Sequence, residues 1–409
     1  MPLPLEGYRI LELAMMAATP YGVRDLADMG AEVIKVEDPG VGDRSRQALT
    51  PGMVNFFPSC SYNYFFESAN RGKRSVALNL REEGGRAAFY RLVPQCDALV
   101  TSLRTPSLKR MGLDYATVSR HNPSIVYVHL NSYGPRGGDA DLPGVDIAAQ
   151  ARSGYLNMMR PNAEGEPVTA GVYGAADMTA SIQVAYATCL ALIARERTGL
   201  GQEVHVSLMG AMLTASELLM EGCLSTGKDP QPPERTSILN PVRNLYRCRD
   251  GKWIYLAMTE SEHFWESFCR VIGEPAIAQD ARFCDDARRA ENHRELISIL
   301  DGVFLTRTRE EWYQSFKEHD CPAAKVQSYR EVAEDPQAVE NEYITTLNHP
   351  VHGPMRTLGV MVNLSRTPGR VGGSAPEVGQ HTEEVLTSLA GYSPEQVRDL
   401  VRVGVAACA

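Results

Sequence analysis

The N-terminal half of the chain alternates between short apolar segments and longer helical segments, and this alternation allows few architectures. Strands connected through helices pair in parallel, and a parallel sheet needs helices on both faces. The sequence therefore predicts an α/β fold. Strands are expected at residues 8–13, 32–36, 98–100, 124–130 and 203–208, and helices at 20–29, 80–93, 177–196 and 209–222. The helix at 177–196 is apolar around most of its circumference, which predicts that it is largely buried.

A linker and a second unit follow. Residues 226–242 contain four prolines and few apolar residues, which is typical of a linker. A strand is expected at 253–257, with helices near 261–272, 292–305 and 309–318. Residues 333–380 lack a regular pattern and lead to a final helix at 382–389.

Charge and cysteine content exclude several classes of protein. With 41 Lys and Arg against 50 Asp and Glu, the net charge is −9, which lacks the basic field that general nucleic-acid binding requires. No apolar run is long enough to cross a bilayer, and the first residues do not form a signal peptide. Nine widely spaced cysteines without a CxxC predict reduced thiols, no metal site and a cytoplasmic protein.

Two basic clusters interrupt this acidic chain, and the second directly follows a predicted strand. They consist of Arg71, Lys73 and Arg74, and of Arg104, Lys109 and Arg110. Ligands of open α/β sheets bind at the carboxyl ends of the strands, where basic groups would suit a phosphate. Two solvated surface loops are the alternative, and the pattern alone leaves both open.

Asp177 stands at the start of an apolar helix, in GVYGAADMTAS. An aspartate there often serves only as a helix cap. Alternatively, the helix N-terminus could keep the carboxylate ionised and available as a nucleophile. Nothing in the local sequence distinguishes the two roles.

The histidines give weaker signals. His129 and His205 lie in strand-like runs, where core histidines are more common than catalytic bases. His349 and His352 are three residues apart in a Pro/Gly loop without a third ligand nearby, so a metal site is not expected there.

Several segments occur in the order and spacing of one enzyme family. They are LADMGAEVIKVEDPGVGDRSR, NRGKRSVALNLREEGG, VDIAAQARSG, PVTAGVYGAADMTAS, RTGLGQEVHVSLMGAML and GQHTEEVL. Through them the chain resembles, essentially from end to end, the family III CoA-transferases, a group with formyl-CoA transferase, carnitine CoA-transferase and the α-methylacyl-CoA racemases.

The resemblance implies a domain plan. A large Rossmann-like, CoA-binding domain would be built from both termini, residues 1–225 and 333–409, and residues 226–332 would form the linker and a smaller inserted α+β domain. Two chains would interlock, as a homodimer or as a heterodimer with a paralogous subunit.

The resemblance also implies a mechanism in which Asp177 is the nucleophile. CoA would pass from an acyl-CoA donor, with succinyl-CoA as a candidate, to a carboxylic acid through an aspartyl-CoA thioester. The thioester energy is conserved, so neither ATP nor a permanently bound cofactor is implied. The backbone near Ala18 is the implied donor to the oxyanion.

The implied CoA contacts are Lys73, Arg74, Ser102, Leu103, Arg104 and Arg110. Lys73 and Arg110 match family residues near the CoA phosphates, which suits their charge. Ser102 and Leu103 stand where the family has asparagine and phenylalanine, so these two contacts depart from its pattern.

Other departures concern the reaction and the substrate. Val145 stands where the racemases have a histidine, which favours transfer over racemisation, and Asp146 matches an acidic position beside the nucleophile. Ala17 replaces the glutamine of formyl-CoA transferases, and residues 232–245 contain no glycine. Formyl and oxalyl transfer are therefore disfavoured.

A bulkier acid, such as a dicarboxylate, is favoured instead, and Arg235 or Arg243 is a candidate for binding its second carboxylate. Two alternatives to the transferase stay open. One is an acyl-CoA racemase or isomerase, and the other is a non-catalytic subunit of a hetero-oligomeric CoA-transferase.

Overall fold

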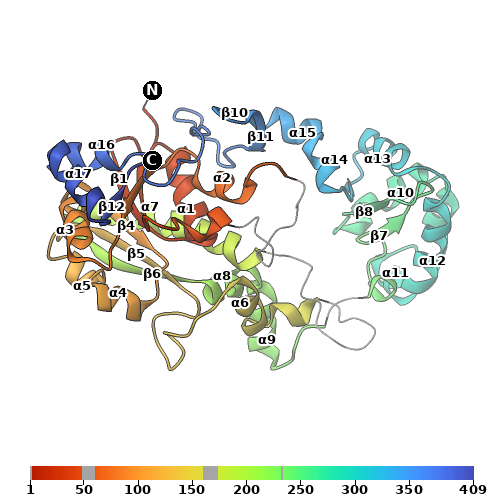
Figure 1. The fold of residues 1–409 in the computed structure, drawn as a ribbon. Coiled ribbons are helices and arrows are strands. Elements are labelled where there is room, and N and C mark those ends of the chain that lie inside the picture. Colours follow the sequence, from red (N-terminus) through yellow and green to blue (C-terminus); the bar gives the residue numbers. More distant parts are fainter. Residues whose placement is uncertain (1, 48–59, 160–173, 232–233) are drawn as a thin grey trace. The chain divides into compact units, whose positions relative to one another are not determined.

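The computed structural model describes residues 2–47, 60–159, 174–231 and 234–409. The chain divides into two compact units, which are visible in Figure 1. The large unit consists of Met1–Pro230 and Val339–Ala409, and the small unit consists of Gln231–Ala338. The PVTAGVYG part of the motif before Asp177 lies almost wholly outside the described residues.

A seven-stranded sheet forms the centre of the large unit, in the order β12-β3-β2-β1-β4-β5-β6. All pairs are parallel except β12 with β3. The strands are β1 (Arg9–Leu13), β2 (Glu32–Glu37), β3 (Arg74–Leu78), β4 (Ala98–Thr101), β5 (Val126–Asn131), β6 (Gln202–Ser207) and β12 (Ala406–Ala407). The predicted α/β fold with a parallel sheet is therefore confirmed, and the order 3-2-1-4-5-6 is that of doubly wound sheets.

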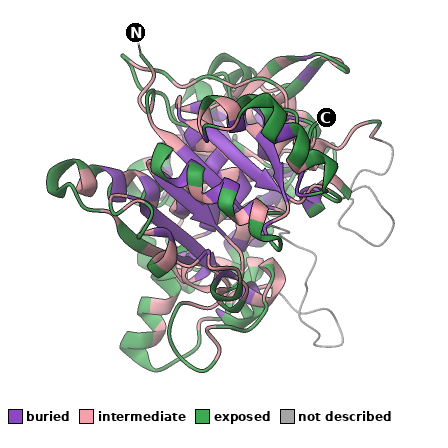
Figure 2. Ribbon diagram, turned by 60° about the vertical axis from the view of Figure 1, so that its left-hand side comes forward, coloured by how far each residue is buried: buried purple, intermediate pink, exposed green. Residues whose placement is uncertain are grey.

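Helices cover both faces of this sheet. They are α1 (Ala18–Asp28), α2 (Tyr64–Asn70), α3 (Glu83–Leu92), α4 (Thr105–Met111), α5 (Tyr115–Val118), α6 (Asp146–Arg152), α7 (Ala175–Thr198), α8 (Leu208–Ala215), α9 (Glu217–Thr226), α16 (Thr382–Ser388) and α17 (Pro394–Arg402). Successive strand residues point to opposite faces of the sheet, and both faces are buried, so β1 and β2 are buried along nearly their whole length, charged residues included. Figure 2 shows these buried strands.

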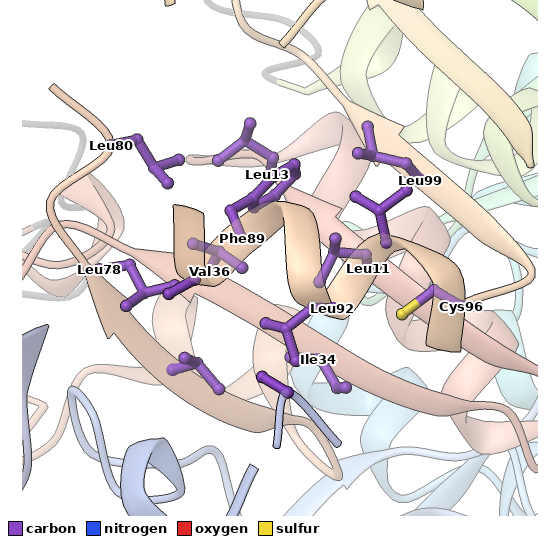
Figure 3. Close-up of a cluster of buried hydrophobic side chains, with 14 of the residues drawn as sticks. Leu11, Leu13, Ile34, Val36, Leu78, Leu80, Phe89, Leu92, Cys96 and Leu99 are labelled. Carbon is purple, nitrogen blue, oxygen red and sulfur yellow. The ribbon is translucent and has the colours of Figure 1, made fainter. Parts of the chain in front are cut away.

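Two hydrophobic cores result. On one face Leu11 and Ile34 of the sheet pack with Phe89 and Leu92 of α3, as Figure 3 shows. On the other face Ile10 lies in the core that the sheet forms with α1, α7 and α8.

The helix α7 differs from its prediction. Ala180, Val184 and Ala191 are buried in the core, whereas Ile182 and Tyr186 are 66% and 64% exposed. The expectation of a largely buried helix is therefore wrong along one face. Contrary to the expectation that no apolar run is long enough to cross a bilayer, α7 is long and apolar enough among the described helices, by length and composition alone. Its buried face belongs to the core of the large unit.

The C-terminal segment holds more structure than its sequence predicts. Residues 333–380 contain α15 (Pro336–Glu340) and an antiparallel hairpin of β10 (Ile344–His349) and β11 (Gly353–Leu358). The buried guanidinium of Arg71 donates to Leu358 O and pairs with Asp28 at 2.6 Å, which ties this hairpin to α1.

The small unit has its own antiparallel sheet and aromatic core. Its elements are β7 (Leu245–Arg247), β8 (Trp253–Leu256), β9 (Ala323–Lys325), α10 (Ser261–Val271), α11 (Asp286–Glu291), α12 (His293–Phe304), α13 (Arg309–Glu318) and α14 (Tyr329–Ala333). Trp312, Phe316 and Phe304 are fully buried in its centre.

The core under α3 allows a first prediction. Leu92 is fully buried, so Leu92→Ala should leave a cavity and lower the free energy of unfolding by about 2–5 kcal/mol. Leu92→Met nearly conserves the volume and should cost less than about 1.5 kcal/mol. Urea denaturation measures both, and equal losses for the two variants would contradict the packing described here.

Candidate active site

A cavity of about 620 Å³ lies in the large unit. Its walls come from the segments that directly follow β1, β4 and β5, together with the first residues of α6, α7 and α8. The carboxyl ends of parallel strands meet at one edge of a sheet, which is where ligands of such folds bind.

Most of the predicted site residues meet at this cavity. Those that line it are Ala17, Ala18, Ser102, Leu103, Arg104, Val145, Asp146 and Asp177. They come from four separate parts of the chain, so only the fold brings them together.

Asp177 is the third residue of α7, and its position depends on Asp146. One carboxylate oxygen of Asp146 accepts the N–H groups of Ala176 (2.7 Å) and Asp177 (3.0 Å). The other accepts the N–H of Gly174 (3.1 Å), whose φ of +80° suits glycine. Asp146 thus caps α7 from another helix and satisfies N–H groups that the helix leaves open.

The surroundings of Asp177 raise the pKa of its carboxyl group. Burial, and secondly the charge of Asp146, raise the pKa of Asp177 from 3.8 to about 7. The position at a helix N-terminus therefore does not hold the pKa of Asp177 at or below its usual value, and the N–H groups of Ala176 and Asp177 bind the carboxylate of Asp146. Near neutral pH, Asp177 is divided between its protonated and ionised forms.

The turn between β1 and α1 lines the same cavity and leaves several hydrogen-bond donors without an acceptor. Within the described chain, the N–H groups of Ala17, Ala18 and Thr19 have no acceptor, and the buried Thr19 hydroxyl has none either. Ala18 begins α1 without a side-chain cap. Such open N–H groups at a helix N-terminus suit an oxyanion.

Three of the implied CoA contacts lie elsewhere. Lys73 is buried, and its ammonium contacts Glu12 (2.7 Å), Pro20 O (2.8 Å) and Asn70 Oδ1 (3.1 Å). Burial lowers the pKa of Lys73 to about 8 in spite of Glu12. Because protein oxygens enclose this ammonium, the structure does not present it to a phosphate.

Neither Arg74 nor Arg110 lines the cavity. Arg74 pairs with Glu32 and Glu384, and Arg110 is exposed on α4. Of the basic residues in the two clusters, Arg104 alone reaches the cavity, where it donates to Asp141 O at 2.6 Å.

The cavity also contains residues that the sequence did not single out for it. The apolar ones are Met15, Met16, Tyr21, Phe65, Leu130, Ala140, Leu142, Pro143, Ile147, Met178 and Leu208. His129 is buried, as expected, but it lines the cavity, and its Nε2 lies 2.8 Å from Leu103 O. Burial lowers the pKa of His129, which favours a neutral imidazole.

His129 also pairs in register with His205 across β5 and β6. Together with Glu203 these histidines place ligand atoms within 4.8 Å of one another, a spacing that a metal ion could use, although Glu203 and His205 are exposed. Each histidine is the fourth residue of its six-residue strand, and the pairing follows from the parallel register of β5 and β6, which the sequence pattern alone does not fix.

Comparisons with known proteins extend over nearly the whole chain. A family model described as CoA-transferase family III matches residues 5–382. The (R)-2-hydroxy-4-methylpentanoate CoA-transferase of Clostridioides difficile is 31% identical over 407 residues, which are 97% of each chain. The succinyl-CoA:glutarate CoA-transferase of Mus musculus is 28% identical over 98% of this chain and 90% of its own.

Among solved structures, a CAIB/BAIF family protein from Brucella suis superposes with a TM-score of 0.81 at 26% identity. The superposition covers 95% of this chain and all of the other.

Because the pKa of Asp177 is raised, replacing this residue with a neutral one should stabilise the folded protein by an amount that depends on pH. Between about pH 4 and pH 7 the folded protein holds a proton that the unfolded chain releases, so this group's contribution to stability falls as pH rises through that window. Asp177→Asn cannot ionise and should raise Tm at about pH 8, with the difference shrinking toward pH 4. Thermal unfolding across this range measures it, and a difference that is constant with pH would contradict the assignment.

Proposed function

The chain belongs to CoA-transferase family III, and we propose that it moves CoA from an acyl-CoA donor to a carboxylic acid through an aspartyl-CoA thioester on Asp177. The observation that carries this proposal is the position of Asp177. Asp177 lines a cavity of about 620 Å³, and Ala17, Ala18 and Thr19, whose N–H groups have no acceptor within the described chain, line the same cavity.

The first half of the reaction loads CoA onto the enzyme. The Asp177 carboxylate attacks the thioester carbonyl carbon, the C–S bond breaks, and a mixed anhydride and CoA thiolate form. The thiolate then attacks the Asp177 carbonyl carbon of the anhydride and expels the donor acid as a carboxylate. The enzyme is left as the aspartyl-CoA thioester.

The second half repeats these steps with the acceptor. The acceptor carboxylate attacks the aspartyl thioester and releases CoA thiolate, which then attacks the acceptor carbonyl of the new anhydride. Acyl-CoA leaves, and Asp177 returns to a carboxylate. Each addition places negative charge on a carbonyl oxygen, which the N–H groups of Ala18 and Thr19 would stabilise.

For CoA itself we propose contacts with Ser102, Leu103 and Arg104. These three follow β4 and line the cavity, and Arg104 supplies a cation. The buried position of Lys73 and the positions of Arg74 and Arg110 outside the cavity favour other roles for those residues.

For the acid, the relatives suggest two classes, a branched 2-hydroxy acid and a dicarboxylate, with succinyl-CoA as the first donor to test. The apolar lining of the cavity supports the former class. Arg235 and Arg243 are the residues that the sequence analysis named as candidates for binding a second carboxylate. In the small unit, Arg235 pairs with Asp301 at 2.7 Å, and Arg243 is exposed.

We further propose an interlocked dimer, as a homodimer or with a paralogous chain, in the cytoplasm. The exposed apolar residues of α7 support a subunit contact, since a soluble chain rarely leaves such a row uncovered. The predicted division into a Rossmann-like domain of residues 1–225 and 333–409 and an inserted part at 226–332 belongs to the same proposal.

Trapping the intermediate tests the mechanism. After incubation with a panel of acyl-CoAs and then hydroxylamine, mass spectrometry should find the modification on the peptide that contains Asp177. The Asp177→Ala variant should form no adduct, and its kcat should be lower by about 10³-fold or more. An unmodified peptide with CoA binding intact would support a racemase or a non-catalytic subunit instead.

The pH profile gives an independent prediction. Because Asp177 attacks as a carboxylate, kcat/KM should rise with pH to a plateau with a midpoint near the free-enzyme pKa of about 7. Asp146→Asn removes the neighbouring charge and should move the midpoint to lower pH. Asp141→Asn, which alters another carboxylate of the cavity, should leave the midpoint in place, and equal shifts in both variants would refute the assignment.

A further inference from the structure

Four charged side chains lie close together beneath the turn between β1 and α1. They are Glu12, Lys35, Asp43 and Lys73, and we name them the buried ion cluster. Lys35 pairs with Glu12 at 3.0 Å and with Asp43 at 2.8 Å, and Lys73 pairs with Glu12 at 2.7 Å. None of the four residues is more than 3% exposed.

The cluster binds the backbone of the turn at three points. Lys35 Nζ donates to Ala14 O (3.0 Å), Asp43 Oδ1 accepts the N–H of Met16 (3.0 Å), and Lys73 Nζ donates to Pro20 O (2.8 Å). These contacts hold the beginning, the middle and the end of residues 14–20. The same segment contributes Met15, Met16, Ala17, Ala18 and Thr19 to the cavity wall.

The middle contact holds a residue in an unfavourable conformation. Met16 has a φ of +68°, a region that residues with a Cβ rarely adopt. Such conformations persist only where the surroundings impose them, and they concentrate at functional sites. The hydrogen bond from Met16 to Asp43 is the described contact that fixes this N–H.

Asp43 makes further hydrogen bonds through Oδ1 and through its own N–H group. Its Oδ1 also accepts the N–H and the hydroxyl of Ser45, both at 2.8 Å, and its own N–H donates to Glu37 Oε2 at 2.9 Å. Buried ion pairs contribute little net stability, because desolvation offsets their attraction. The buried ion cluster binds a turn beside the cavity at three points, which suggests that it has a role other than stabilising the fold.

We propose that Asp43 is a positioning residue, which Lys35 holds in place and which fixes the β1–α1 turn so that the N–H groups of Ala18 and Thr19 point at the oxyanion. This inference rests on the proposed CoA transfer. Asp43 does not line the cavity, so it acts through the backbone of the turn and not on the substrate.

Asp43→Asn tests the proposal against a matched control. Asp28→Asn also neutralises a buried carboxylate in an ion pair, with Arg71, but Asp28 has no described contact with residues 14–20. We expect Asp43→Asn to lower kcat by about 10²-fold, the scale of a displaced oxyanion donor, with KM for acyl-CoA nearly unchanged. Asp28→Asn should lower Tm without a comparable loss in kcat. Equal losses of kcat in the two folded variants would overturn the proposal.

The Ser45→Ala variant provides a second test of the proposal if the Asp43→Asn variant does not fold. It removes one hydrogen bond to Asp43 and no charge, and it should lower kcat by several-fold at unchanged KM. An unchanged kcat would overturn the proposal. The Asp177 adduct in the wild-type protein is measured first, because its absence refutes the proposed function, whereas its presence with a fully active Ser45→Ala refutes only the role of Asp43.

Discussion

The sheet of the large unit must be covered by helices on both faces, and the position of the site follows from this constraint. Ile10 and Leu11 lie on opposite faces of the sheet, and both are buried. A reactive side chain in the middle of either face would therefore replace a residue of the hydrophobic core. Reactive groups therefore lie at the ends of the strands, where the chain turns before the next helix begins. The cavity accordingly collects the turns after β1, β4 and β5 and the first residues of α7.

At that edge the protein buries carboxylates in two different ways. Burial alone would raise the pKa of Asp43, but Lys35 and the N–H groups of Met16 and Ser45 lower it. Among the described residues no cation offsets the burial of Asp177, and Asp146 adds to the effect, so the pKa of Asp177 rises. A paired carboxylate is fixed and unreactive, whereas an unpaired one beside a cavity is a better nucleophile when ionised. The difference between the two lies in their neighbours and not in their residue type.

The sequence could predict what depends on local pattern. The alternation of apolar and helical segments identified β1, β2, β4, β5 and β6, but β3 was missed because it begins with Arg74 inside a basic cluster. The same cluster favoured a phosphate contact for Lys73, since charge pattern cannot show that Glu12 of another strand lies opposite. Asp177 needed the family resemblance, because a capping and a catalytic aspartate look alike in sequence.

The helix α7 joins the site to the question of assembly. Asp177 lies in its first turn, and the next residue, Met178, both lines the cavity and is 38% exposed. Ile182, Tyr186 and Leu190 follow at intervals of four, which places all of them with Met178 on one face of the helix. If a second chain covered this row of residues, the covered surface would extend to Met178 in the cavity wall. In the proposed dimer, the subunit contact and the surroundings of Asp177 would therefore share a helix face, so a substitution on one is expected to affect the other.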